Sequence, residues 1–163
     1  MPLLEEDQKH LTAAQGFTEL GMFLDANAEL EEIDPEVRHV PEVLVVRLSV
    51  CHALKKWELM QTVARKLALY DGENPNWIVS LAAATRRAEN IEAAKRILLE
   101  AVEQHPNHAL MHYNLACYES VLGELEVAKA RLEHALKMDP GMRVMALDDE
   151  DLKPLWDELS ESI

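Results

Sequence analysis

Three histidines and an acidic run are the residues of this sequence whose types best suit metal binding. His105, His108 and His112 lie close together, and the last two are four residues apart, which places them on one face of a helix. No cysteine or carboxylate nearby completes a convincing zinc ligand set. The acidic run 148–151 lacks the glycine and the alternating spacing of a calcium loop. We therefore expect packed or loop histidines, a solvated acidic run at a helix start, and neither a metal nor a cofactor.

Cys117 is a candidate nucleophile because histidines precede it. No orienting partner stands at a suitable spacing, so a buried structural thiol is the better interpretation. Cys51 and Cys117 are the two cysteines of the chain, too few for a disulfide framework, and we expect both as reduced thiols inside helices. The sequence has no glycine-rich phosphate loop. These observations predict that the protein is not an enzyme.

Composition favours a helical protein in an intracellular setting. Hydrophobic residues make up 48% of the 163 residues, aromatic residues only 5%, and alanine and leucine dominate. The net charge of −14 repels phosphate backbones, which argues against nucleic acid as a partner. No apolar run approaches the length of a membrane span and no targeting segment is visible, so we expect no membrane partner and a cytoplasmic location.

The negative charge gathers at the two ends of the sequence. Residues 1–40 hold ten acidic and two basic residues, and residues 141–163 hold seven acidic and two basic residues. Polar ends keep repeat proteins soluble, and this is the preferred interpretation. Docking of a basic partner on the ends is the alternative.

A two-helix pattern recurs every 34 residues. The copies start at Asp7, Pro41, Pro75 and Ala109, and each combines two amphipathic helices with a tight turn. An alanine stands at position 20 in three copies. The copy 109–142 fits best, with apolar, turn and closing residues in place: Leu115, Ala116, Gly123, Ala128, Leu132, Ala135 and Pro140. Four copies in one register are hard to obtain by chance.

The second copy and the C-terminal segment depart from the pattern. Lys55 and Lys56 replace the usual glycine of the turn, and Arg47 occupies a position that is normally leucine. After Gly141 the register is lost. Asp151 is predicted to cap a short helix that tolerates Pro154 in its first turn.

These features resemble the tetratricopeptide-repeat (TPR) proteins, of the small stand-alone bacterial type. The resemblance implies an all-α, right-handed α-solenoid of about four helical hairpins with a C-terminal capping helix. The predicted division is an N-terminal tail 1–6, repeats at 7–40, 41–74, 75–108 and 109–142, and a capping helix 143–163.

By the same resemblance, the first helix of each hairpin lines a concave groove that binds a protein or peptide. The candidate partner-binding residues are Val45, Ser49, His52, Asn76, Val79, Ser80, Ala83, Arg86, Arg87, Tyr113, Asn114 and Cys117. This apolar and small-polar lining, with a basic point at Arg86 and Arg87, suits an extended peptide or a helix with aliphatic anchors. Alternatively, the valines belong to the core and the arginines are merely solvated. The basic and amide arrangement of chaperone-binding TPR domains is missing.

The leading functional prediction is a non-enzymatic scaffold or adaptor that binds a partner protein in this groove. A second possibility is an accessory protein that decorates a cytoskeletal filament or large assembly, as bacterial kinesin-light-chain-like proteins associated with bacterial tubulin do. A third is a self-associating TPR oligomer. We expect a monomer or a weak homodimer.

Overall fold

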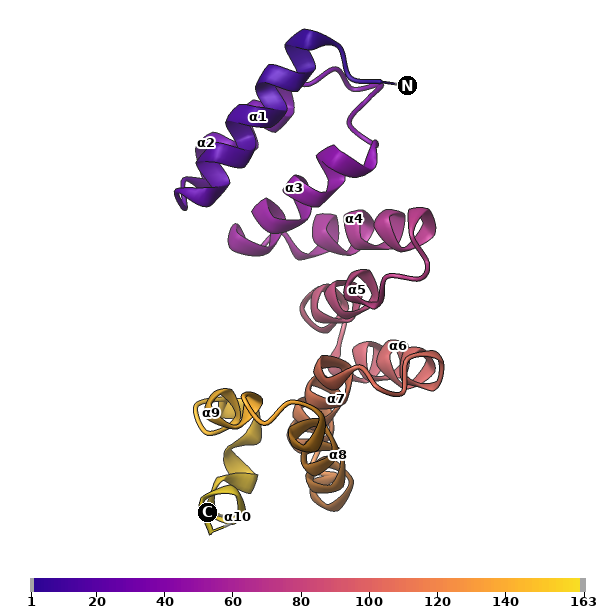
Figure 1. Ribbon diagram of the computed structural model, residues 1–163, viewed down its shortest axis with the longest axis vertical. Coiled ribbons are helices and arrows are strands. Elements are labelled where there is room, and N and C mark those ends of the chain that lie inside the picture. Colours follow the sequence, from indigo (N-terminus) through magenta and orange to yellow (C-terminus); the bar gives the residue numbers. More distant parts are fainter. Residues whose placement is uncertain (1, 162–163) are drawn as a thin grey trace. The chain divides into compact units, whose positions relative to one another are not determined.

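The chain is helical throughout the residues that the structure describes, 2–161. In that range the computed structural model contains ten α-helices, one 3₁₀ helix and no strand (Figure 1). The valine-rich stretch 43–47, which alone in the sequence has β-like composition, lies inside a helix. The predicted all-α class is therefore confirmed. No helix in the described part of the chain combines the length and the apolar character that crossing a bilayer requires.

The helices form two compact units, Met1–Ala88 and Glu89–Ile163. Unit 1 contains α1 (Glu5–Glu19), α2 (Phe23–Glu32), α3 (Pro41–Ala53), α4 (Trp57–Tyr70) and α5 (Pro75–Ala88). Unit 2 contains α6 (Ile91–Gln104), α7 (Ala109–Val121), α8 (Leu125–Met138), α9 (Met142–Ala146), the 3₁₀ helix η1 (Glu150–Leu155) and α10 (Trp156–Glu161).

Three helices begin where the 34-residue spacing places a repeat start: α3 at Pro41, α5 at Pro75 and α7 at Ala109. Proline suits the first turn of a helix, where its missing N–H leaves no hydrogen bond unmade. By contrast, α1 begins at Glu5, inside the predicted tail 1–6. The boundary between the two units falls within the predicted third repeat, 75–108, so the division into four repeats stays a prediction.

Left-handed residues make the tight turns inside the hairpins. Gly21 has φ +73° between α1 and α2, and Gly123 has φ +81° between α7 and α8. Lys55 occupies the same conformation, with φ +57°, between α3 and α4. The sequence had placed Lys55 and Lys56 at this turn in place of glycine, and the backbone still makes the turn with a side chain that disfavours it.

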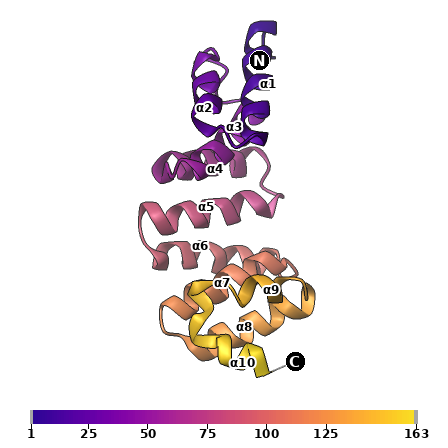
Figure 2. The ribbon, with the colours of Figure 1, turned by 90° about the vertical axis from the view of Figure 1, so that its left-hand side faces the viewer.

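The core of unit 1 consists of two apolar clusters that share α3. One cluster joins α1, α2 and α3 around Leu11, Leu30 and Ile33, and the other lies between α3, α4 and α5. Helix α3 contributes Val43, Val46 and Val50 to the first cluster and Leu44, Leu48 and Cys51 to the second. Because α3 is buried on two sides, its sequence is apolar almost without interruption. Burying each of these large side chains contributes roughly 2 kcal/mol. Figure 2 shows α3, α4 and α5 following one another along unit 1.

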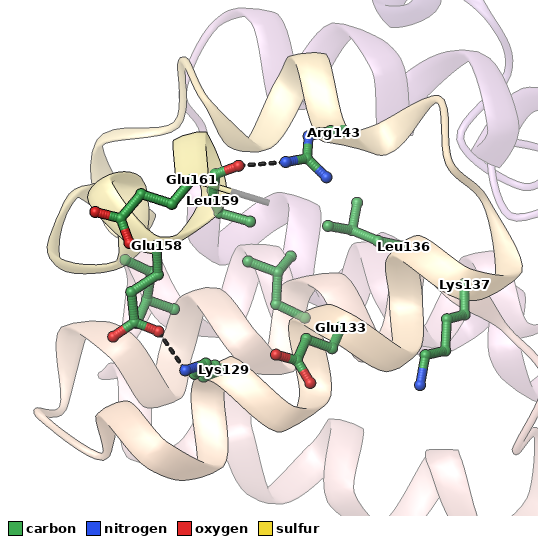
Figure 3. A pocket seen from close by; sticks show the side chains of 10 residues that line it. Lys129, Glu133, Leu136, Lys137, Arg143, Glu158, Leu159 and Glu161 are labelled. Carbon is green, nitrogen blue, oxygen red and sulfur yellow. Dashed lines mark hydrogen bonds and ion pairs between the residues drawn. The ribbon is translucent and has the colours of Figure 1, made fainter. Parts of the chain in front are cut away.

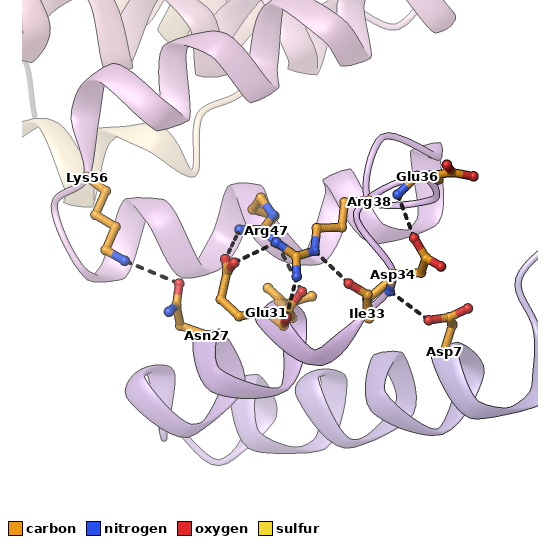
Figure 4. Close-up of polar contacts among 10 residues, drawn as sticks. Asp7, Asn27, Glu31, Ile33, Asp34, Glu36, Arg38, Arg47 and Lys56 are labelled. Atoms are coloured by element: carbon orange, nitrogen blue, oxygen red, sulfur yellow. Dashed lines mark hydrogen bonds and ion pairs between the residues drawn. The ribbon is translucent and has the colours of Figure 1, made fainter.

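Arg47, at a position normally held by leucine, is buried because it caps the end of α2. Its Nη1 lies 2.7 Å from Oε1 of Glu31, and its Nη2 donates to the carbonyl of Leu30 at 3.2 Å (Figure 4). Arg38 donates to the carbonyl of Ile33 at 2.6 Å and to the other carboxylate oxygen of Glu31 at 2.8 Å. The hydrogen bond from Arg47 holds the pKa of Glu31 below its ordinary value. The two arginines thus satisfy carbonyls that the helix end leaves without partners.

Helix α7 is the centre of unit 2. Every residue from Met111 to Ser120 is buried except Asn114, because α6, α8 and η1 all pack against this helix. Even Glu119 is buried, and Arg131 of α8 compensates its charge with Nε at 3.0 Å from both carboxylate oxygens. Such a pair is tolerated inside a protein because each charge has its partner.

The segment after Gly141 consists of three short helical elements, α9, η1 and α10, where the sequence predicted one capping helix over 143–163. The cap of η1 is Asp149, which accepts from the backbone N–H of Asp151 at 3.0 Å, so the expected cap at Asp151 is wrong by two residues. Pro154 lies inside η1, as predicted for the start of this helix. The indole N–H of Trp156 donates to the carbonyl of Ala146 at 3.0 Å, and Arg143 donates to the carbonyl of Leu159. These two bonds join α9 to α10.

Candidate partner-binding surface

One side of α3 is open to solvent although the rest of the helix is core. Val45 is 41% exposed, and Ser49 and His52 are exposed along the same helix. Val46, the next residue after Val45, is 7% exposed and belongs to the core. The residues at positions 45, 49 and 52 follow the spacing of one helix face. This face therefore offers an apolar side chain, a hydroxyl and an imidazole within about two turns.

Trp57 brings the ends of α3 and α5 together. The indole of this half-buried residue meets the His52 ring edge to face, with ring centroids 5.9 Å apart. The Arg87 guanidinium of α5 lies 5.8 Å from the centre of the Trp57 ring. A cation over an aromatic face is attracted by the ring's negative potential. The contact orients a charged side chain that would otherwise sample many conformations.

The remaining candidate residues of α5 differ in exposure. Asn76 is exposed, Ser80, Ala83 and Arg86 are half-buried, and Val79 is 8% exposed. Val79 therefore fits the alternative interpretation that some valines of the pattern belong to the core. The structure thus brings His52 and Arg87 together around Trp57 and leaves Asn76 at the opposite end of α5.

The candidate residues of α7 are covered by the chain's own C-terminal segment. Tyr113 is 2% exposed and Cys117 is 4% exposed, while Asn114 is half-buried. The Tyr113 hydroxyl donates to Oδ2 of Asp149 at 2.9 Å, and the Cys117 thiol donates to the same oxygen at 3.6 Å. Burial raises the pKa of Tyr113 above its ordinary value, so its hydroxyl keeps its proton. Partner contact at Tyr113 and Cys117 requires the C-terminal segment to leave.

The same cluster is where a metal ion could be considered. Sγ of Cys117 and carboxylate oxygens of Asp149 and Asp151 lie within 4.8 Å of one another. A protonated phenol and a protonated thiol already donate to Asp149, so hydrogen bonding accounts for this grouping. We assign it a structural role that holds the C-terminal segment on α7.

Two of the three grouped histidines have structural partners in unit 2. Nδ1 of His108 accepts from the backbone N–H of Met111 at 3.2 Å and so caps α7. Nε2 of His112 bonds the carbonyl of Pro106 at 2.7 Å, and its ring meets His134 edge to face with centroids 4.5 Å apart. Burial lowers the pKa of His112, which favours the neutral ring. The spacing of these histidines therefore reflects helix capping and packing.

A groove beside α8 is a feature that the sequence did not indicate. It has a volume of about 520 Å³ and lies between α8 and the segment formed by α9 and α10 (Figure 3). Its apolar floor consists of Leu132, Leu136, Leu155 and Leu159. On the rim, Lys129 pairs with Glu158 at 2.5 Å, and Arg143 is held by the carbonyl of Leu159. The groove depends on how the C-terminal segment folds back, which no periodic pattern encodes.

Antiparallel helical hairpins whose first helices start 34 residues apart define the tetratricopeptide-repeat type of fold, and the chain has that fold. The particular solved structures that share it are those of MamA. A crystal structure of MamA protein aligns with TM-score 0.74 and 16% sequence identity, covering 96% of this chain and 87% of that chain. MamA from residue 41 to its end, from Desulfovibrio magneticus RS-1, aligns with TM-score 0.73 and 17% identity, covering 98% and 94%. MamA MSR-1 aligns with TM-score 0.71 and 19% identity, covering 82% and 77%.

At these identities the likeness concerns the fold. No protein-family model matches the sequence. No curated protein matches it either.

Proposed function

We propose that this protein is a non-enzymatic interaction scaffold that binds a partner protein on the α3–α5 face of unit 1. We define this face by Val45, Ser49 and His52 of α3 and Arg87 of α5. The carrying observation is that α3 keeps one apolar and polar face open although the rest of the helix is buried. A helix face that displays an aliphatic side chain beside hydrogen-bond donors suits a peptide or a partner helix.

The geometry of Trp57 supports this choice of surface. Trp57 is half-buried and held between His52 and Arg87, so it combines a fixed orientation with some accessible area. Tryptophan and arginine are the residues that most often dominate binding energy at protein interfaces. On the equivalent face of α7, the C-terminal segment already occupies the surface, which leaves unit 1 as the accessible place for a partner.

The proposal is tested by a pair of matched substitutions. The full-length chain captures its partner from an extract of the cells it comes from, and the affinity of the purified pair is then measured by calorimetry. Val45→Glu is expected to weaken binding at least tenfold, because a carboxylate is costly to desolvate in an apolar contact. Val127→Glu on α8, at a site 50% exposed, is expected to leave the affinity unchanged. Circular dichroism verifies that both variants are folded.

Equal weakening by the two substitutions, or none by Val45→Glu, would contradict the assignment of the surface. The other functional predictions have their own outcomes. Co-sedimentation of the chain with a polymer would favour the filament-decorating accessory protein, and a concentration-dependent dimer in light scattering would favour the self-associating oligomer.

A further inference from the structure

The chain's own C-terminal segment displays how a first helix of this fold binds a ligand. Asp149 receives hydrogen bonds from Tyr113 and Cys117 of α7, and its other oxygen caps η1. Three residues later, Leu152 is fully buried, and η1 packs against α7 and α8. The segment thus binds α7 through one aspartate and one leucine at the start of a helical turn.

The matching face of α3 presents comparable groups without a cover. Two steps of 34 residues back from Tyr113 and Cys117 lie Val45 and Ser49. The Ser49 hydroxyl can donate a hydrogen bond as the Cys117 thiol does, and Val45 offers an aliphatic contact. Both residues are exposed. The repeated position therefore carries an occupied site in unit 2 and an open one in unit 1.

Basic groups gather at the C-terminal end of the open face. His52 and Arg87 flank Trp57, and Lys55 and Lys56 form the turn that leads into α4. This concentration of positive charge stands out in a chain of net charge −14. An acidic ligand is attracted to such a patch, and its approach is steered by the local potential.

We propose that the α3–α5 face binds an acidic segment of a partner protein in which a leucine follows an aspartate by three residues. The aspartate accepts from Ser49 and pairs with Arg87, and the leucine packs on Val45. This inference rests on the proposed function and names the chemistry of the partner.

The chain supplies its own probe for the test. A fluorescein-labelled peptide with the sequence of residues 147–156, LDDEDLKPLW, is titrated with the full-length protein and followed by fluorescence anisotropy. Saturable binding is expected, weakened at least tenfold by Arg87→Glu and at most twofold by Arg65→Glu. Arg65 is exposed on α4, so the control variant carries the same charge change away from the proposed face. Peptides in which Asp149 is changed to Asn or Leu152 to Ser are expected to bind at least tenfold more weakly.

Three results would overturn the inference. The first is no saturable binding, or binding that Arg87→Glu leaves intact. The second is binding that is lost in Tyr113→Phe and kept in Arg87→Glu, which would place the peptide on α7 by exchange with the chain's own segment. The third is a dimer of the chain that the peptide dissociates, which would make a second copy the occupant.

Failure of this inference is distinguishable from failure of the proposed function. A partner whose capture depends on Val45, combined with no peptide binding, keeps the scaffold function and rejects the acidic ligand. Peptide binding without any partner whose capture depends on Val45 rejects the scaffold function instead.

Discussion

Single residues of this chain carry conformations and charges that their helices demand, and Lys55 is the clearest example. Its φ of +57° belongs to the left-handed region that costs a residue with a Cβ about 1 kcal/mol. Gly21 and Gly123 make the corresponding turns of other hairpins without that cost. The turn between α3 and α4 is therefore a site of stored backbone strain.

Lys55→Gly is expected to raise the free energy of unfolding by about 0.5–1 kcal/mol, because the strain disappears and the side chain is exposed. Urea denaturation followed by circular dichroism measures the change. The mirror experiment is Gly123→Ala, where an added Cβ meets no atom within 4 Å and the loss of stability reports the backbone alone. A destabilised Lys55→Gly variant would show that the lysine side chain contributes more than its backbone conformation costs.

Arg47 also shows at residue scale why the sequence pattern deviates. A leucine at this position would fill the core, but it would leave the final carbonyls of α2 and the carboxylate of Glu31 without this donor. The early end of α2 before Pro35 creates the need for such a donor. Asp7 serves the same corner by accepting from the backbone N–H of Asp34 at 2.8 Å.

At the scale of elements, the C-terminal segment and α7 form one closed contact. Its hydrogen bonds converge on Asp149, which joins Tyr113, Cys117 and the backbone of η1. Loss of one such acceptor loosens the whole contact, because the buried donors then have no partner.

Asp149→Ala is expected to increase the labelling rate of Cys117 by a thiol reagent about tenfold, the equivalent of losing roughly 1.4 kcal/mol of docking free energy. Mass spectrometry resolves the labelled sites. Cys51 is the internal reference, since it is buried in unit 1 and burial raises the pKa of its thiol. Asp148→Ala, at an exposed neighbour, should leave both rates unchanged. A parallel rise at Cys51 and Cys117 would indicate general unfolding and contradict the prediction.

At the scale of the whole molecule, the 34-residue spacing predicted the helical class and the starts of α3, α5 and α7, because proline and apolar periodicity act locally. It could not place Asp149 against Tyr113, since a contact between residues 36 apart leaves no periodic signal. For the same reason Tyr113 and Cys117 were expected in an open groove and are covered instead. The α3–α5 residues were within reach of the pattern, but the Trp57 contacts that orient His52 and Arg87 depend on packing.

The net charge of −14 makes self-repulsion a property of the entire chain. Raising the salt concentration from 10 to 200 mM at pH 7 is expected to increase Tm by about 3 °C, because screening weakens repulsion among acidic groups more than it weakens the few close ion pairs. Differential scanning calorimetry measures the shift. Near pH 4.8, the sequence pI, the increase should vanish. A Tm that falls with salt at pH 7 would show that the ion pairs outweigh the repulsion.

The bonds that staple α9 to α10, from Trp156 to Ala146 and from Arg143 to Leu159, have a kinetic consequence. They lie within the C-terminal segment, so they survive when it separates from α7. The segment then moves as a preformed latch, and opening exposes Cys117 in a single cooperative step instead of by gradual fraying.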